Sequence, residues 1–168
     1  QLMISVSGIR GIIGESIQPD QFLRYVMAFG SLQNQGKVVV GSDTRISREM
    51  IRAIVHAGLM STGCEIIDLG ICPTPTVGMM VKELQAQGGI AITASHNPVQ
   101  WNALKFFSSK GVFMDKEQFQ NLMKVFESGS FHLASYDQIG KLRTLSDSCR
   151  THIRKVISAV NLPLIRQK

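Results

Sequence analysis

The sequence predicts a layered α/β/α domain with helices on both faces of a mixed, mostly parallel β-sheet. Short apolar runs, such as residues 37–40 and 90–93, alternate with longer segments whose apolar residues recur every three to four positions. A run of the first kind is typical of a strand buried on both faces, and a segment of the second kind is typical of a helix with one apolar face. Their alternation along the chain favours a sheet covered by helices.

The first half of the chain is predicted to run helix, strand, helix. Residues 19–33 place four apolar side chains on one helical face, and residues 37–40 form a β-branched run that ends at Gly41. Ser47 can cap the next helix through its hydroxyl, and Gly63 can end it. The apolar positions of the two helices are Phe22, Val26, Phe29 and Leu32, followed by Ile51, Ile54, Val55 and Leu59.

The second half continues the alternation. We expect strands at 64–69, 90–93 and 104–107, because each is a short apolar run. A helix over 73–84 separates the first two, and proline is compatible with its first turn. Asp115 can cap one more helix, whose apolar face is Phe119, Leu122, Met123 and Phe126.

The chain divides into one domain and a short C-terminal segment. Residues 1–145 suffice for a domain with its own core. Residues 146–168 are predicted to be helical as far as residue 160 and have little in the domain to pack against. We therefore expect a linker helix that leads to a second domain absent from this sequence. No internal repeat occurs, and no apolar run approaches the ~20 residues of a membrane span, so we expect no membrane partner.

Charge and cysteine content exclude several function classes. The net charge is +6, but residues 1–140 are balanced and the whole excess lies in residues 141–168. No aromatic residue is interleaved there for base stacking, so we expect no nucleic-acid partner. The three cysteines form no CxxC pair, which disfavours a zinc site or a disulfide framework and fits a reduced, cytoplasmic setting.

The most informative loop is Thr-Ala-Ser-His-Asn-Pro at residues 93–98, directly after a predicted strand. Open α/β sheets bind ligands beyond the carboxyl ends of their strands, so Ser95 would be presented to a ligand. His96 and Asn97 can donate hydrogen bonds to anionic oxygens, and Pro98 stiffens the turn. The alternatives are a plain turn capped by serine and a serine hydrolase. The hydrolase is disfavoured because no Gly-x-Ser-x-Gly elbow is present and a histidine adjacent in sequence is a poorly placed base.

Two further loops and one lysine can contribute to the same site. Residues 7–11, Ser-Gly-Ile-Arg-Gly, offer close backbone approach and the planar guanidinium of Arg10 for a phosphate. In residues 41–45, Gly-Ser-Asp-Thr-Arg, the Asp43 and Arg45 side chains can pair and brace the loop. Each loop alone is also compatible with an ordinary turn. Lys105, ten residues after the serine, lies in the next predicted strand.

These segments together resemble the alpha-D-phosphohexomutases, the superfamily of phosphoglucomutase, phosphomannomutase and phosphoglucosamine mutase. Residues 93–98 resemble its active-serine signature, and residues 7–11, 41–45 and 102–105 resemble three further motifs in family order. Two positions depart from the family pattern. Ser42 stands where the family usually has arginine, and Ala103 stands where it usually has glycine.

The resemblance implies an isomerase that moves a phosphoryl group between the 1- and 6-positions of a hexose through a phosphoserine and a hexose 1,6-bisphosphate. Phosphoryl transfer depends on cations and donors held in line. The implied catalytic residues are Ser95 as carrier, Arg10 and Lys105 as cations, with Lys105 also as a proton shuttle, and His96 as an orienting group. The implied substrate-binding residues are Ser7, Asn97, Asn102 and Arg45.

The resemblance also implies partners outside this sequence. Mg²⁺ would bind a phosphate oxygen on Ser95 and three aspartates of a second domain, and a glucose 1,6-bisphosphate-type molecule would act as activator. Because domains two to four are absent, we expect this fragment to be inactive alone. The choice among glucose, mannose and glucosamine phosphates stays open, since it depends on the third domain. The alternative is a non-catalytic, single-domain relative that binds sugar phosphates.

Overall fold

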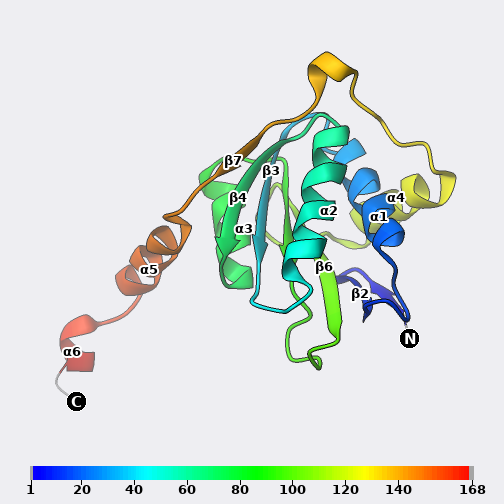
Figure 1. The fold of residues 1–168 in the computed structure, drawn as a ribbon. Coiled ribbons are helices and arrows are strands. Elements are labelled where there is room, and N and C mark those ends of the chain that lie inside the picture. The colour runs from blue at the N-terminus through cyan, green and yellow to red at the C-terminus, as the bar shows by residue number, and fades with distance from the viewer. Residues whose placement is uncertain (1, 167–168) are drawn as a thin grey trace.

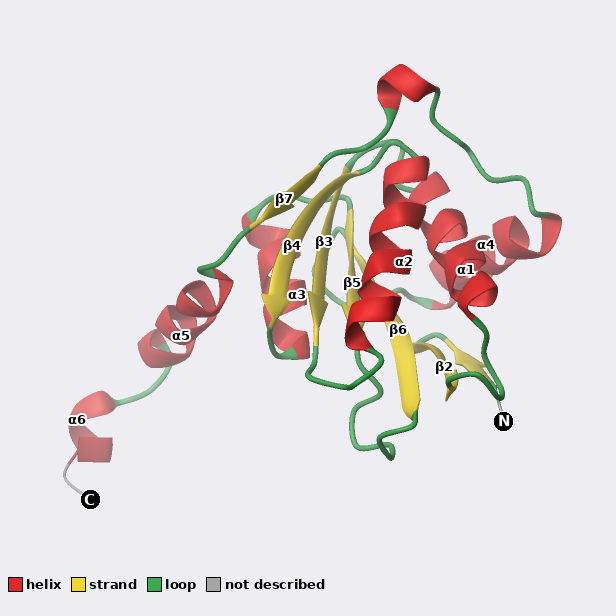
Figure 2. Ribbon diagram, in the orientation of Figure 1, coloured by secondary structure: helices red, strands yellow, loops and turns green. Residues whose placement is uncertain are grey.

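The computed structural model describes residues 2–166 and contains a seven-stranded sheet between two layers of helices (Figures 1 and 2). The strands are β1 (Met3–Ser5), β2 (Gly8–Ile12), β3 (Lys37–Ser42), β4 (Glu65–Ile71), β5 (Gly88–Ile92), β6 (Trp101–Ser108) and β7 (Leu142–Thr144). The helices are α1 (Pro19–Ser31), α2 (Arg48–Ser61), α3 (Thr74–Glu83), α4 (Lys116–Ser128), α5 (Ser148–Ser158) and α6 (Leu162–Arg166), with one 3-10 turn at Tyr136–Gln138.

The sheet is mixed, in the order β1-β2-β6-β5-β3-β4-β7. β3 pairs in parallel with β4 and β5, and β4 with β7, whereas the pairs β1–β2, β2–β6 and β5–β6 are antiparallel. The predicted α/β/α fold with a mixed sheet is confirmed. Parallel pairings make up half of the sheet rather than most of it, because the chain turns back after β5 and the N-terminal hairpin joins on that side.

Alternate residues of the central strands pack into two cores. Val38 and Val40 of β3 belong to the core beneath α1, α2 and α4, whereas Val39 belongs to the core beneath α3. All three valines are fully buried. This explains why the run is apolar at every position: a strand covered on both faces has no solvent-facing side chain.

The predicted helices and central strands agree with the structure to within a few residues, but three short strands, β1, β2 and β7, were missed. Residues 7–11 were predicted to be a glycine-rich loop, and most of them form β2. The strand forms because Ile9 to Ile12 pair with Leu104 to Trp101 of β6, a contact between distant parts of the chain. β7, which pairs with residues 66–68 of β4, was also not predicted.

The C-terminal segment forms an arm that extends from the sheet edge (Figure 1). The helix predicted for residues 146–160 is present as α5, and a second short helix, α6, follows it. α5 contacts α3 through a 2.7 Å hydrogen bond between Thr76 Oγ1 and His152 Nδ1 and a 3.5 Å ion pair between Lys155 and Glu83. The division at residue 145 and the linker role remain predictions. Within residues 2–166, every helix is too short or too polar to cross a bilayer.

A buried charged cluster joins α2 to β4 and gives a prediction for the pH dependence of stability. Asp68 is fully buried and accepts hydrogen bonds from the Arg52 guanidinium. Nε2 of His56 lies 3.5 Å from the Asp68 carboxylate and, among the described residues, has no hydrogen-bond partner. Burial lowers the pKa of His56 below its ordinary value of 6.5, with a further lowering by Arg52, although Asp68 opposes the shift.

Because the folded state binds this proton less readily than the unfolded chain, His56 should destabilise the fold as the pH falls below about 6.5. We expect the free energy of unfolding in urea to decrease between pH 7.5 and 5.5 in wild type, and to decrease less in His56→Gln. Equal slopes for the two proteins would contradict this prediction.

Candidate active site

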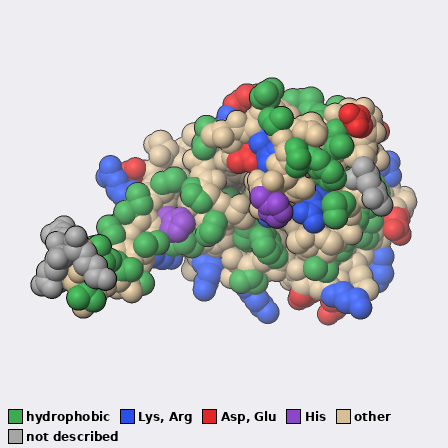
Figure 3. Space-filling model, turned by 90° about the horizontal axis from the view of Figure 1, so that it is seen from below, with side chains coloured by type: hydrophobic (Ala, Val, Ile, Leu, Met, Phe, Trp, Pro, Cys, Tyr) green, Lys and Arg blue, Asp and Glu red, His purple; other side chains and the backbone are tan. Residues whose placement is uncertain are grey.

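The loops that follow β3 and β5 meet at the carboxyl edge of the sheet. These two loops line an open cavity of about 500 Å³. The residues that line it are Asp43, Thr44, Arg45 and Ile46 after β3, and Thr93, Ser95, Asn97 and Val99 after β5. Figure 3 views the molecule from this end and shows a histidine beside basic side chains, which are lysine or arginine. The expectation that the serine loop and residues 41–45 lie together is confirmed.

Ser95 is exposed and sits in an unusual backbone conformation. Its φ of 57° places it in the left-handed region, which costs a non-glycine residue on the order of 1–3 kcal/mol. Its N–H donates to Oγ1 of Thr93 at 3.2 Å, and its Oγ lies 3.4 Å from Nδ1 of His96. The side chain therefore projects into solvent from a constrained turn, and His96 is within reach of anything bound to it. The part played by Thr93 was not predicted.

Arg45 is the group that holds this turn. A guanidinium has five N–H donors, and in this structure every one of them is used. The acceptors are Asp43 Oδ2 (3.1 Å) and the carbonyl oxygens of Pro98 (2.7 Å), Trp101 (3.0 Å), Ser95 (2.9 Å) and Asn97 (2.7 Å). The predicted pairing of Asp43 with Arg45 is confirmed. The predicted contact of Arg45 with substrate is replaced by a positioning role, because no N–H remains to donate to a ligand.

Asn102 also differs from its predicted substrate-binding role. Its side chain is fully buried. Nδ2 donates to Oγ of Ser47 at 2.8 Å, and Oδ1 accepts from the backbone N–H of Ala103 at 2.8 Å. Asn102 thus ties the start of β6 to the residue before α2, and it is not accessible to a ligand. Residue type alone carried no indication of this burial, since asparagine is usually exposed.

A second, smaller cavity brings three predicted residues together beside the serine loop. Ser7, Arg10 and Lys105 line a space of about 40 Å³ with Gly8, Ile9, Thr93, Ala94 and Ala103. Nη1 of Arg10 donates to Oδ1 of Asn97 at 3.4 Å, which links this cavity to the loop. Burial lowers the pKa of Lys105, and the positive charge of Arg10 lowers it further. The site therefore has two adjacent cations, one of which releases its proton more readily than an ordinary lysine.

Close packing of β2 on β6 fixes this arrangement. In the ladder, Arg10 lies opposite Ala103, so its side chain shares a face of the sheet with Lys105. Gly8 has a φ of 120°, and a Cβ there would lie 2.0 Å from the carbonyl oxygen of Leu104. Only glycine fits that position.

The two departures from the family pattern lie in buried positions. Ser42 donates to the carbonyl oxygen of Gly70 at 3.2 Å and accepts from Nε of Arg48 at 2.7 Å. Ala103 is 2% exposed and forms part of β6. Ser42 therefore connects β3, the end of β4 and α2. Neither side chain projects from the serine loop.

Comparison with known proteins identifies the chain. Residues 2–133 match the family model described as phosphoglucomutase/phosphomannomutase, alpha/beta/alpha domain I. This chain belongs to the phosphoglucomutase/phosphomannomutase family. The resemblance inferred from the four sequence motifs is therefore confirmed.

Relatives within this phosphoglucomutase/phosphomannomutase family are much longer than the present chain. A probable phosphoglucosamine mutase of Thermococcus gammatolerans is 40% identical over 93% of this chain, and the match covers 34% of that protein. A phosphoglucomutase/phosphomannomutase of Thermococcus kodakarensis is 39% identical over 96% of this chain, with 36% of that protein covered. The chain thus spans about a third of the length of these relatives.

A solved structure shows the same fold. The crystal structure of a proposed phosphomannomutase from Thermus thermophilus superposes with a TM-score of 0.81 at 26% sequence identity. It matches 96% of this chain, which corresponds to 37% of the other protein. The α/β/α arrangement described above is therefore that of a mutase-family domain.

Proposed function

We propose that this domain carries a phosphoryl group on Ser95 in a hexose 1-phosphate/6-phosphate mutase, and that it does so together with domains outside this chain. The observation that carries the proposal is the exposed Ser95 hydroxyl. Arg45 holds the backbone of its turn, and Thr93 and Ala94 of the same loop share a cavity with Arg10 and Lys105. In the transferring group, negative charge spreads over the equatorial oxygens, and fixed cations stabilise it.

Each transfer breaks one bond to phosphorus and forms another. A sugar hydroxyl attacks phosphoserine, the bond from phosphorus to Ser95 Oγ breaks, the departing Oγ takes up a proton, and a hexose bisphosphate forms. After the intermediate reorients, Ser95 Oγ gives up that proton and attacks the other phosphoryl group, the bond from that phosphorus to the sugar oxygen breaks, and the sugar oxygen leaves protonated as a hydroxyl. We assign Nζ of Lys105 to accept the proton of the attacking hydroxyl, because its lowered pKa increases the neutral fraction near pH 7. Lys105 is then a cation while charge develops, and His96 orients the phosphate.

The described residues do not form a Mg²⁺ site by themselves. Residues 2–166 contain no cluster of three or more His, Cys, Asp or Glu side chains that could hold a metal ion. Asp43 is paired with Arg45, and a single serine phosphate supplies too few oxygens for the octahedral coordination that Mg²⁺ prefers. The mechanism above therefore contains no step through the metal. Mg²⁺ held by Ser95 phosphate and by aspartates of another domain remains a prediction.

The partners follow from the same proposal. The substrate is a hexose phosphate, and a glucose 1,6-bisphosphate-type molecule primes the serine. Three free cysteines, two of them buried, agree with a reduced compartment such as the cytoplasm. Which hexose phosphate is the substrate depends on domains outside this chain.

The direct test uses the full-length enzyme that carries this domain. After incubation with glucose 1,6-bisphosphate, intact mass and peptide mapping should show about one added phosphoryl group, located on Ser95. A phosphoryl group on another residue would refute the carrier assignment. No uptake at all would favour the non-catalytic alternative.

Removing the Arg45 brace should slow this phosphorylation without unfolding the domain. We expect Arg45→Met to lower the rate of phosphoryl uptake about 100-fold, because a displacement of about 1 Å at a reacting group has an effect of that size. Arg45→Lys keeps the charge beside Asp43, but a lysine cannot donate to all four carbonyl oxygens at once. Its rate of phosphoryl uptake should therefore be closer to that of Arg45→Met than to that of wild type. Circular dichroism checks that both variants fold. A wild-type rate in Arg45→Met would show that the brace is dispensable.

A further inference from the structure

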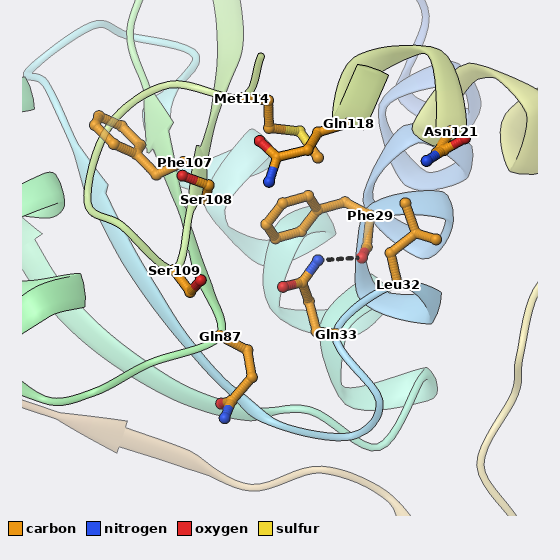
Figure 4. A pocket seen from close by; sticks show the side chains of 10 residues that line it. All are labelled: Phe29, Leu32, Gln33, Gln87, Phe107, Ser108, Ser109, Met114, Gln118 and Asn121. Atoms are coloured by element: carbon orange, nitrogen blue, oxygen red, sulfur yellow. Dashed lines mark hydrogen bonds between the residues drawn. The ribbon is translucent and has the colours of Figure 1, made fainter. Parts of the chain in front are cut away.

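A cavity of about 220 Å³ lies at the edge of the sheet opposite Ser95, where β5 begins and β6 ends (Figure 4). Its polar wall comes from separate elements. Gln33 follows α1, Gln87 precedes β5, Ser109 follows β6 and Gln118 belongs to α4. Because these segments meet only in the folded chain, no sequence motif indicates the cavity, and the mechanism proposed above does not use it.

The lining of this cavity, which we call the amide pocket, is uncharged. The residues that line it are glutamine, asparagine, serine, phenylalanine, leucine and methionine, with no lysine, arginine, histidine or acidic side chain. A phosphate or carboxylate would find no cation to offset the loss of its hydration. A ligand of the amide pocket is therefore neutral.

Three of its carboxamides are fixed in orientation by backbone groups. Gln33 Nε2 donates to the carbonyl oxygen of Phe29 at 2.9 Å. Gln118 Oε1 accepts from the N–H of Asp115 at 3.1 Å, and Gln87 Oε1 accepts from the N–H of Lys37 at 2.7 Å. A backbone N–H can only donate and a carbonyl oxygen can only accept, so the assignment of oxygen and nitrogen in each amide is unambiguous.

The other end of each carboxamide has no protein partner within residues 2–166. These groups are one acceptor, Oε1 of Gln33, and two donors, Nε2 of Gln118 and Nε2 of Gln87. Gln33 is only 7% exposed as a residue, but its Oε1 is not among the fully buried atoms that lack a partner, so this oxygen is open to the pocket and can accept from water or a ligand. Figure 4 shows the Gln33 oxygen and the Gln118 nitrogen directed into the same space from opposite sides, with Ser109 on a third side.

The apolar part of the wall decides between two kinds of neutral ligand. A nucleobase needs an accessible aromatic face, but Phe29 is fully buried and Phe107 is 5% exposed. A sugar ring needs only hydroxyl partners and small apolar contacts, and each of its hydroxyls can donate and accept. The volume is below the roughly 300–1,000 Å³ of sites for drug-sized ligands, which suits a single ring. We propose that the amide pocket binds an unphosphorylated monosaccharide, separately from the phosphoserine site.

The test measures binding of D-glucose, D-mannose and N-acetyl-D-glucosamine to the full-length protein by calorimetry. We expect at least one of them to bind, and Gln118→Met to weaken that binding at least tenfold by removing the fixed donor. Gln120→Met is the matched control, because Gln120 lies exposed on the same helix outside the pocket and should leave binding unchanged. Ser109→Ala should weaken binding too, and it leaves the helix cap of α4 intact.

The location is checked by hydrogen–deuterium exchange and by one active-site variant. Sugar binding should slow exchange in residues 108–121 and leave residues 93–98 unaffected, and it should persist in Lys105→Met. Binding that is lost in Lys105→Met but kept in Gln118→Met would place the sugar at the phosphoserine site and overturn the proposal. Absence of binding by all three sugars would also overturn it. None of these results depends on whether Ser95 is phosphorylated.

Discussion

Ser95→Ala is expected to abolish phosphoryl uptake from glucose 1,6-bisphosphate in the full-length enzyme, with at least a ~1,000-fold loss of mutase activity. The reason is chemical: the variant has no hydroxyl to form the bond to phosphorus, and no other serine lines the cavity that contains Ser95. Intact mass spectrometry and a coupled mutase assay measure the two effects. Ser130→Ala is the matched control and should behave as wild type, because Ser130 is exposed and lies outside the two cavities that contain Ser95 and Lys105.

Ser95→Thr separates the hydroxyl from the backbone that presents it. Threonine retains the hydroxyl, but a β-branched residue is disfavoured at a φ of 57°. We expect slow but measurable phosphorylation, because the Arg45 bonds oppose relaxation of the loop. Normal activity in Ser95→Ala would refute the carrier role. Wild-type activity in Ser95→Thr would show that the left-handed conformation is not required.

The central fold could be predicted because its signals are local. α1 and β3 are marked by helical spacing, a β-branched run and flanking glycines, all within a few residues of each element. β2 could not be recognised in the same way. Its glycines suggest a loop, and it becomes a strand only through pairing with β6, which begins at Trp101, far along the chain. β7 has three exposed residues and likewise depends on its partner, β4.

The candidate site shows the same limit at the level of side chains. The position of Ser95 after a strand followed from the motif, and so did the nearness of its loop to Arg10 and Lys105. The use of every Arg45 donor could not be predicted, because four of the five acceptors are carbonyl oxygens 50 to 56 residues away. The burial of Asn102 depends in the same way on where α2 begins. Residue type indicates which groups could bind a phosphate, whereas the fold decides which of them are free to do so.

Lys105→Met is expected to lower the rate of Ser95 phosphorylation about 1,000-fold. In the proposed mechanism the variant loses both a cation for the transferring phosphate and the proton acceptor, and removal of one such group typically reduces rates by about 10²–10³. Lys110→Met, at an exposed position outside the site, controls for loss of charge alone. A rate within tenfold of wild type would remove Lys105 from the mechanism.

The pH dependence tests which of these two tasks Lys105 performs. As a proton acceptor it must be neutral, so the rate should rise with pH up to the Lys105 pKa, which burial and Arg10 hold below its ordinary value. Arg10→Gln removes one cause of that lowering. The Lys105 pKa should therefore rise, and the increase in rate should shift to higher pH, in addition to any loss from the missing Arg10 charge. If Lys105 acted only as a cation, the rate would instead fall as the pH rises through its pKa. Whether the rate rises or falls with pH around the Lys105 pKa, and whether this change moves to higher pH in Arg10→Gln, thus distinguishes proton transfer by Lys105 from charge stabilisation by Lys105.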